Sequence, residues 1–234
     1  MKLLRPGLMP YGQALAWQLQ LRTRLQEEMA DDPVGYLLCL QHPPVVTLGK
    51  RGSLDDIFGL DQLLERGTQF YKIDRGGEAT YHGPGQLVIY PIVKLDRLKI
   101  GVVDLIRGMA GCLGKALEEY GVFATYDCDH PGLWTVDTPA RKIASVGMRV
   151  SRGVTTHGAA INLTNDITPF TLFVPCGMPN APLTRLDDYC DETVDVDDFT
   201  DRFLAHFSAF LDRPFEEIEQ EPPPVDDWVL PLAL

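Results

Sequence analysis

The stretch that determines the fold class is Lys142-Ile-Ala-Ser-Val-Gly-Met-Arg-Val150, followed by Ser151-Arg152-Gly153 and Val154-Thr-Thr-His-Gly-Ala-Ala-Ile-Asn-Leu163. From Ala144 to Val150 every second residue is apolar, which is the period of a half-buried strand. The following apolar run is able to pair with this strand across a short turn that contains glycine. The sequence therefore predicts a β-hairpin, and the rest of the chain has to supply the sheet around it.

Further strands and helices are expected on both sides of this hairpin. Short apolar runs bounded by proline or glycine predict strands, and apolar residues that recur every three or four positions predict helices. Their mixed order favours an α/β (α+β) fold in one domain, with a mixed β-sheet flanked by helices. Strands are expected at residues 35–40, 45–48, 69–74, 87–93, 122–126 and 133–136, and helices at residues 12–30, 102–120 and 196–211.

Length, apolar runs and cysteine content limit the class of protein. A chain of 234 residues is long enough for one buried core and does not require a second domain. No apolar run approaches the roughly 18–20 residues that cross a bilayer, and the first residues lack a signal-peptide stretch. Five cysteines without C-x-x-C pairs are typical of a reducing compartment, so we expect a cytoplasmic protein without a membrane anchor.

The net charge of −12 is unevenly distributed along the chain. Residues 186–227 hold 15 acidic residues and only two bases, so the remainder is close to neutral. An acidic chain argues against a nucleic-acid partner. Residues 141–152 hold four bases and no acid, and this strip and the Lys50-Arg51 pair are candidate docking surfaces for an acidic protein partner. A solvated acidic face near the C-terminus accounts for the charge distribution equally well.

A glycine-rich segment, Arg75-Gly-Gly-Glu-Ala-Thr-Tyr-His-Gly-Pro-Gly-Gln86, predicts a pocket lined by backbone. Glycine lets the backbone approach a ligand closely, and proline fixes the direction of the chain. The segment lacks the third glycine and following helix of a dinucleotide fingerprint, and the chain has no G-K-[ST] motif. We therefore expect no phosphate-binding loop and no nucleotide cofactor.

Cys176 is the strongest candidate for a nucleophile. It lies between Pro175 and Gly177 in a predicted turn that follows an apolar run. A thiol with a pKa near 8.5 is only a few per cent ionised at pH 7, and a neighbouring cation increases the thiolate fraction. Lys142 opens a strand of small residues and is the expected cation.

Two histidines are alternative partners for this thiol. Cys–His pairs are the commoner arrangement, and both His82 and His157 lie in glycine-rich surroundings. Each is equally explained as a histidine that bonds to backbone in a turn. Cys128-x-His130 resembles half of a metal site, but no second pair with ligand spacing follows, so we expect no zinc.

Taken in order, these segments resemble the octanoyltransferases of lipoate biosynthesis, the LipB type. The resemblance covers about residues 10–215, and several long motifs carry it at once. It implies an octanoyltransferase catalytic domain over residues 1–215 and an acidic, proline-rich tail over residues 216–234. The motifs are R-G-G-E-A-T-Y-H-G-P-G-Q-L-V-I-Y-P from Arg75, R-K-I-A-S-V-G-M-R-V from Arg141, T-H-G-A-A-I-N-L from Thr156, P-C-G from Pro175, and the early Gln41-His42-Pro43-Pro44 with Thr47-Leu48-Gly49.

The resemblance also implies a fold, a reaction and partners. The fold is that of the catalytic module of lipoate and biotin protein ligases. Octanoyl or lipoyl passes from an acyl carrier protein thioester to a lysine of a lipoyl domain, the first step of protein lipoylation, without a cofactor. Cys176 would carry the acyl group, and Lys142 would lower the pKa of the thiol and act as general acid and base. The implied partners are octanoyl-acyl carrier protein, the lipoyl domains of 2-oxoacid dehydrogenase complexes and the glycine cleavage H protein.

The implied acyl-binding residues come from the glycine-rich segment and from both strands of the hairpin. Their small side chains would leave room for a straight chain, and their amides would bind its carbonyl oxygen. They are Arg75, Gly76, Gly77, Glu78, Ala79, Thr80, Tyr81, His82, Ser145, Val146, Gly147, Gly158, Ala159 and Ala160, with His157 as a supporting candidate.

Three alternatives to this transferase stay open. An ATP-dependent lipoate ligase shares the fold and a lysine but does not need Cys176. A cysteine hydrolase or thioesterase would use the same nucleophile with water as acceptor. A non-catalytic module would bind lipoyl domains and would tolerate the loss of Cys176.

Overall fold

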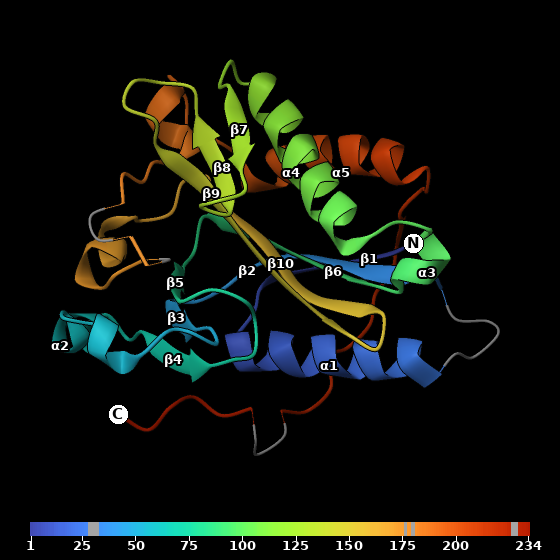
Figure 1. Ribbon diagram of the computed structural model, residues 1–234, viewed down its shortest axis with the longest axis horizontal. Helices are drawn as coiled ribbons and strands as arrows, with labels where there is room; N and C mark the ends of the chain where they lie inside the picture. Colours follow the sequence, from blue (N-terminus) through green and yellow to red (C-terminus); the bar gives the residue numbers. More distant parts are fainter. Residues whose placement is uncertain (28–32, 176, 179–180, 226–228) are drawn as a thin grey trace.

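The computed structural model describes residues 1–27, 33–175, 177–178, 181–225 and 229–234. Within these residues the chain forms one large mixed sheet and a smaller sheet beside it. Figure 1 shows one helix along one face of the large sheet and two helices across the other. The predicted fold class, a mixed sheet flanked by helices, is confirmed.

The large sheet has the strand order β11-β1-β2-β6-β10-β9-β8-β7. Most of its pairs are antiparallel, and β1 pairs in parallel with both β2 and β11. Its strands are β1 (Lys2–Leu8), β2 (Gly35–Gln41), β6 (Gln86–Val93), β7 (Ala124–Asp127), β8 (Gly132–Thr135), β9 (Lys142–Ser151), β10 (Val154–Asn162) and β11 (Glu216–Glu217).

The small sheet has the order β4-β3-β5. Its strands are β3 (Val45–Leu48), β4 (Gln69–Lys72) and β5 (Ala79–His82). The predicted strand at residues 69–74 is two residues longer than β4. Strand β5 lies inside the glycine-rich segment, where the sequence predicts no strand.

The predicted hairpin is present as β9 and β10. Ser151 pairs with Val154, so the turn holds two residues, Arg152 and Gly153, one fewer than expected. Both have positive φ angles, 47° and 77°. That combination is typical of a type I′ turn, whose twist matches the twist of the flanking strands.

The helices form around apolar faces and end where a cap is available. Asp195 begins α5 by accepting hydrogen bonds from the N–H groups of Asp197 and Asp198. Predicted residues 28–30 of the first helix lie outside the described residues. None of the described helices is long and apolar enough to cross a membrane. The helices are α1 (Tyr11–Glu27), α2 (Leu60–Glu65), α3 (Leu95–Leu98), α4 (Val102–Glu118) and α5 (Val196–Leu211).

Two apolar clusters fill the space on the two faces of the large sheet. Helix α1 buries Trp17, Leu21 and Leu25 against one face. Helices α4 and α5 bury leucine, methionine and phenylalanine side chains against the other face, including Phe199 and Phe203. Because both faces are covered, the central strands β2 and β6 are buried along almost their whole length.

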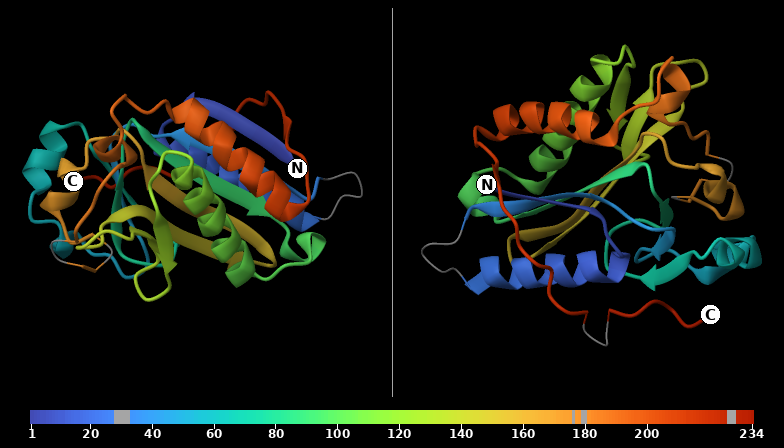
Figure 2. Two further views of the ribbon diagram at one scale, coloured as in Figure 1. Left: turned by 90° about the horizontal axis from the view of Figure 1, so that it is seen from above. Right: turned by 180° about the vertical axis from the view of Figure 1, so that it is seen from behind.

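The C-terminal residues follow the body of the protein. After β11 has paired with β1, the chain runs past α1 toward the small sheet (Figure 2). Val229 is buried, and the N–H of Leu232 donates to the carbonyl of Phe70 at 2.7 Å. The division into a catalytic domain, residues 1–215, and a tail, residues 216–234, stays a prediction.

Candidate active site

A cavity of about 330 Å³ lies among the β9–β10 hairpin, the small sheet and the segment that follows β4. It collects most of the residues that the sequence singles out, because Gly147 and Gly158 pair across the hairpin and the 75–77 segment crosses beside them. Thirteen predicted residues line it: Arg75, Gly76, Gly77, Thr80, His82, Lys142, Ser145, Val146, Gly147, His157, Gly158, Ala159 and Ala160.

Lys142 places a buried amine in this cavity. Its side chain is only 1% exposed, and its Nζ has no hydrogen-bond acceptor among the described residues. The Nζ lies 5.7 Å from the ring centre of Trp134, whose face attracts a cation. A β-carbon at residue 132 would come within 2.6 Å of the Lys142 Cε, so Gly132 makes room for this side chain. A buried amine without a fixed partner is suited to exchanging protons with a substrate.

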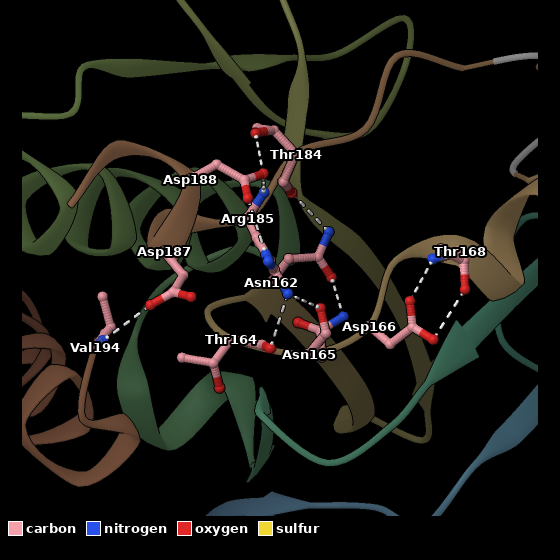
Figure 3. Close-up of polar contacts among 10 residues, drawn as sticks. All are labelled: Asn162, Thr164, Asn165, Asp166, Thr168, Thr184, Arg185, Asp187, Asp188 and Val194. Atoms are coloured by element: carbon pink, nitrogen blue, oxygen red, sulfur yellow. Dashed lines mark hydrogen bonds and ion pairs between the residues drawn. The ribbon is translucent and has the colours of Figure 1, made fainter. Parts of the chain in front are cut away.

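The chain that follows the predicted nucleophile is fixed beside Lys142. The N–H of Lys142 donates to the carbonyl of Pro182 at 2.7 Å, and the N–H of Thr184 donates to the carbonyl of Lys142 at 3.0 Å. Figure 3 shows the hydrogen bonds that hold residues 184–188 against residues 162–165. In it, Asn162 Nδ2 donates to the carbonyl of Thr184 at 3.0 Å, and Arg185 bonds both to Asp188 and to the carbonyls of residues 164–165.

Cys176 itself lies outside the described residues, but residues on both sides of it are described. Pro175 forms a parallel bridge with Ala79, and the N–H of Val174 donates to the carbonyl of Asp56 at 3.0 Å. Gly177 has a φ of +71°, and a β-carbon there would meet the carboxylate of Glu78. The turn therefore needs glycine at this position on two counts, its backbone angle and its surroundings.

His82 belongs to a buried chain of hydrogen bonds that leads toward Lys142. Its Nδ1–H donates to Gln86 Oε1 at 2.6 Å, and Gln86 Nε2 donates to Asn162 Oδ1 at 2.9 Å. Asn162 in turn holds Thr184. Burial, followed by the nearby His42, lowers the pKa of His82 to about 3, so the ring is neutral at physiological pH.

His157 lies at the other end of the cavity from Lys142. It pairs with Met148, six positions along β9 from Lys142, which corresponds to about 20 Å of strand. Its Nε2 lies 3.1 Å from Asp74 Oδ1, and Asp74 Oδ2 lies 2.6 Å from Arg149 Nε. Burial lowers the pKa of His157. The pKa of Asp74 is also lowered, mainly by the hydrogen bond that Asp74 accepts from His157. This register gives no support to His157 as the base for a thiol beside Lys142.

Three predicted acyl-binding residues do not line the cavity, because side chains alternate along β5. Thr80 and His82 face the cavity, whereas Ala79 and Tyr81 face the core of the small sheet. Glu78 lies beside Arg51, with 3.4 Å between Oε1 and Nε. The segment is instead fixed by Arg75, whose Nη2 donates to the carbonyls of Thr47 and Glu78.

Other lining residues come from segments that the sequence does not mark as part of an acyl site. Tyr90 Oη–H donates to His42 Nε2 at 2.9 Å, and His42 Nδ1–H donates to the carbonyl of Met9 at 2.7 Å. In the sequence, this side of the cavity is indicated only by Tyr90 and His42, two polar side chains next to apolar residues. The lining residues that were missed are Tyr11, Thr47, Arg51, Val88, Tyr90, Ile106, Tyr126, Asp129, His130, Pro131 and Met148.

Four cysteines are described, and each lies either where the thiolate is disfavoured or at the surface. Burial raises the pKa of Cys39 to about 12 and that of Cys112 to about 11. Among the described residues, Asp127, Cys128 and Asp129 bring possible metal ligands within 4.8 Å of one another. Asp127 ends β7 and the other two residues are exposed in the turn that follows, and exposed acidic groups commonly lie close together without a metal.

The same fold occurs in solved ligases that act on lipoate and biotin. A bipartite lipoate protein ligase from Thermoplasma acidophilum superposes with a TM-score of 0.75 over 94% of this chain and 87% of that chain, at 18% identity. Biotin protein ligase from Aquifex aeolicus, in complex with biotin and ATP, gives a TM-score of 0.54 over 90% and 70%, at 14% identity. The fold is therefore that of the lipoate and biotin protein ligase catalytic module.

Sequence comparison narrows this class. Residues 10–208 match the lipoyl protein ligase A/B catalytic domain. An octanoyltransferase from Alkaliphilus metalliredigens is 36% identical over 204 residues, covering 86% of this chain and 91% of that protein. One from Solibacter usitatus is 38% identical over 207 residues, covering 88% and 90%. The chain belongs to the octanoyltransferases of this family and is an acyltransferase.

Proposed function

We propose that this protein transfers octanoyl or lipoyl from the thioester of an acyl carrier protein to a lysine of lipoyl domains, acting in the cytoplasm through a Cys176 acyl-enzyme. The observation that carries the proposal is the buried Lys142 amine, which lines the cavity and has no hydrogen-bond acceptor among the described residues. Residues 1–215 would form the catalytic domain.

The first half-reaction moves the acyl group onto the enzyme. The Cys176 thiolate attacks the thioester carbonyl, a new C–S bond forms, and the bond to the carrier sulfur breaks. The leaving thiolate takes a proton from the Lys142 ammonium. The carbonyl oxygen bears negative charge during this step, and backbone N–H groups of the glycine-rich walls are the available donors for it.

The second half-reaction delivers the acyl group to the acceptor. The lysine amine of a lipoyl domain attacks the acyl-enzyme, its N–C bond forms, and the bond to Cys176 breaks. The neutral Lys142 accepts the proton that the amine loses, which restores the ammonium beside a thiolate. A thioester is already activated, so the cycle balances without ATP.

The proposed donor and acceptor proteins are supported by this chemistry and by what related proteins are described with. A solved relative, the Thermoplasma lipoate protein ligase, is described together with its E2 lipoyl domain. For this chain we propose the lipoyl domains of 2-oxoacid dehydrogenase complexes and the glycine cleavage H protein as acceptors. Octanoyl-acyl carrier protein is the proposed donor.

Intact-mass spectrometry tests the proposal directly. After incubation with octanoyl-carrier protein and no ATP, the wild-type chain should gain one octanoyl group, and Cys176→Ala should gain none. Adding a lipoyl domain should then discharge the adduct and acylate that domain. A requirement for ATP would favour a ligase, release of free octanoate with the lipoyl domain unmodified would favour a hydrolase, and an active Cys176→Ala would overturn the acyl-enzyme.

A further inference from the structure

The tail returns to the catalytic module at Val229. The side chain of Val229 is 2% exposed, whereas that of the next residue, Leu230, is 59% exposed. Leu232 then bonds through its N–H to the carbonyl of Phe70 at 2.7 Å, so the segment lies beside β4. The family match ends at residue 208, so this contact lies outside the shared domain.

Val229 is buried in the same apolar cluster as Tyr11, Leu15, Tyr71 and Ile73. A β-carbon at residue 12 would lie 3.1 Å from the Val229 carbonyl oxygen. The tail therefore covers the first turn of α1 at close range. Glycine at residue 12 permits this approach, because a β-carbon there would also lie 2.9 Å from the Tyr71 hydroxyl.

Tyr11 connects this cluster to the cavity. It is a lining residue, and its ring stacks nearly parallel to that of His82, with 6.4 Å between their centres. It also lies 5.0 Å from the ring of Tyr71, inside the cluster that holds Val229. Because protein interiors are close-packed, the position of the Tyr11 ring depends on the volume filled behind it.

We infer that Val229 is a positioning residue that limits the length of the acyl chain, by supporting Tyr11 as a wall of the cavity. The inference rests on the proposed function, because it concerns the acyl group that the cavity holds. A smaller side chain at residue 229 lets the ring retreat and admits longer chains. A larger one pushes the ring inward and favours shorter chains. Discrimination of one methylene in an apolar pocket is about 10- to 200-fold, so the effect is measurable.

The test is an acyl-length profile of the full-length protein. kcat/KM is measured with hexanoyl, octanoyl, decanoyl and dodecanoyl thioesters for wild type, Val229→Ala and Val229→Leu. The ratio of decanoyl to octanoyl should rise about 10-fold in Val229→Ala. The ratio of hexanoyl to octanoyl should rise in Val229→Leu. Leu230→Ala changes the exposed neighbour and should keep the wild-type profile.

A purely structural role gives a different result. It would lower the melting temperature and reduce the rate with every acyl length by the same factor, in both variants. Unchanged length ratios in the two folded variants would overturn the inference while leaving the proposed function intact. If wild type transfers none of these chains, the proposed function itself fails, and the two failures are thereby separated.

Discussion

Gly147 and Gly158 pair directly across the β9–β10 hairpin, yet a methyl group would meet very different surroundings at the two positions. At residue 158 a β-carbon would lie 2.0 Å from the carbonyl oxygen of Ile89 in β6. At residue 147 the nearest atom is the carbonyl oxygen of Gly76, at 3.5 Å, an ordinary contact. One glycine permits close pairing of the sheet, and the other leaves space in the cavity.

These two glycines should therefore respond differently to alanine. Gly158→Ala should lower the free energy of unfolding by about 2 kcal/mol or more, because backbone must move. Gly147→Ala should keep the wild-type stability but reduce kcat/KM for octanoyl by about 10-fold, because its methyl group occupies cavity space. Thermal melting and transfer assays measure the two effects. Equal destabilisation of both variants would contradict the assignment of Gly147 to the cavity.

Lys142 provides a second prediction, in which stability and activity change in opposite directions. Among the described residues the buried Lys142 Nζ has no hydrogen-bond acceptor, an arrangement that costs stability, and an apolar side chain of similar length removes that cost. Lys142→Met should raise the free energy of unfolding by about 1 kcal/mol or more. It should also slow acyl transfer by about 10²- to 10⁴-fold, the usual range for a general acid and base.

A matched lysine controls for this substitution. Lys115 is exposed on α4, and Lys115→Met should change neither quantity appreciably. Denaturant melts and single-turnover acylation give the two numbers for each variant. A loss of stability in Lys142→Met would mean that the ammonium is well compensated in the fold.

The hairpin and the main helices were predictable because their sequence periods are clear. Strand β1 was not, because Lys2, Arg5 and Pro6 interrupt its apolar pattern. Its register shifts between Leu4 and Gly7, so the proline lies at an irregularity where a missing N–H is tolerated. Strand β5 is only four residues long and buried on both faces, so it has no alternation to detect.

The sequence predicts those site residues that lie in recognisable motifs, but not the lining residues that come from ordinary core elements. Gly158 and Ser145 lie in conspicuous runs of small residues, and both line the cavity. Tyr11 and Val88 look like ordinary core residues, since only the packing of α1 and β6 brings them to the cavity. The separation of His157 from Lys142 depends on strand register, which residue types alone do not define.

Two buried histidines should make the fold sensitive to acid. Burial lowers the pKa of His42 to about 4 and that of His82 to about 3, whereas an exposed histidine titrates near 6.5. As pH falls below 6.5 the unfolded chain takes up protons that the folded chain does not. The free energy of unfolding should therefore fall between pH 6.5 and 4, by about 3 kcal/mol for each histidine, and should not change from this cause above pH 6.5.

Urea melts across this pH range measure the effect. His82→Gln should flatten the slope, because one of the buried histidines, which also include His157, is then absent. A His82→Gln protein with an unchanged slope would show that another group controls acid unfolding.

Charge at the entrance to the cavity gives the last prediction. The four bases between residues 141 and 152 do not form one surface, because Lys142 is buried and Arg149 pairs with Asp74. Arg51 also pairs with an acid, Glu78, but the contact is longer, at 3.4 Å, and the Arg51 side chain is 71% exposed and lines the cavity, so we expect it to be the better docking residue for an acidic carrier protein. Arg51→Glu should raise KM for octanoyl-carrier protein by about 10-fold and leave KM for a small octanoyl thioester nearly unchanged.

Arg152→Glu is the matched control for this charge reversal. Arg152 is exposed at the hairpin turn, ten positions along the chain from Lys142, and does not line the cavity. Its reversal changes the net charge equally but should have little effect on either substrate. The Arg51 effect should also shrink as salt rises, because screening weakens attraction between exposed charges. If Arg51→Glu and Arg152→Glu raise KM for the carrier protein equally, the effect is one of net charge. If Arg51→Glu raises KM equally for the carrier protein and for the small thioester, the substitution has damaged the cavity.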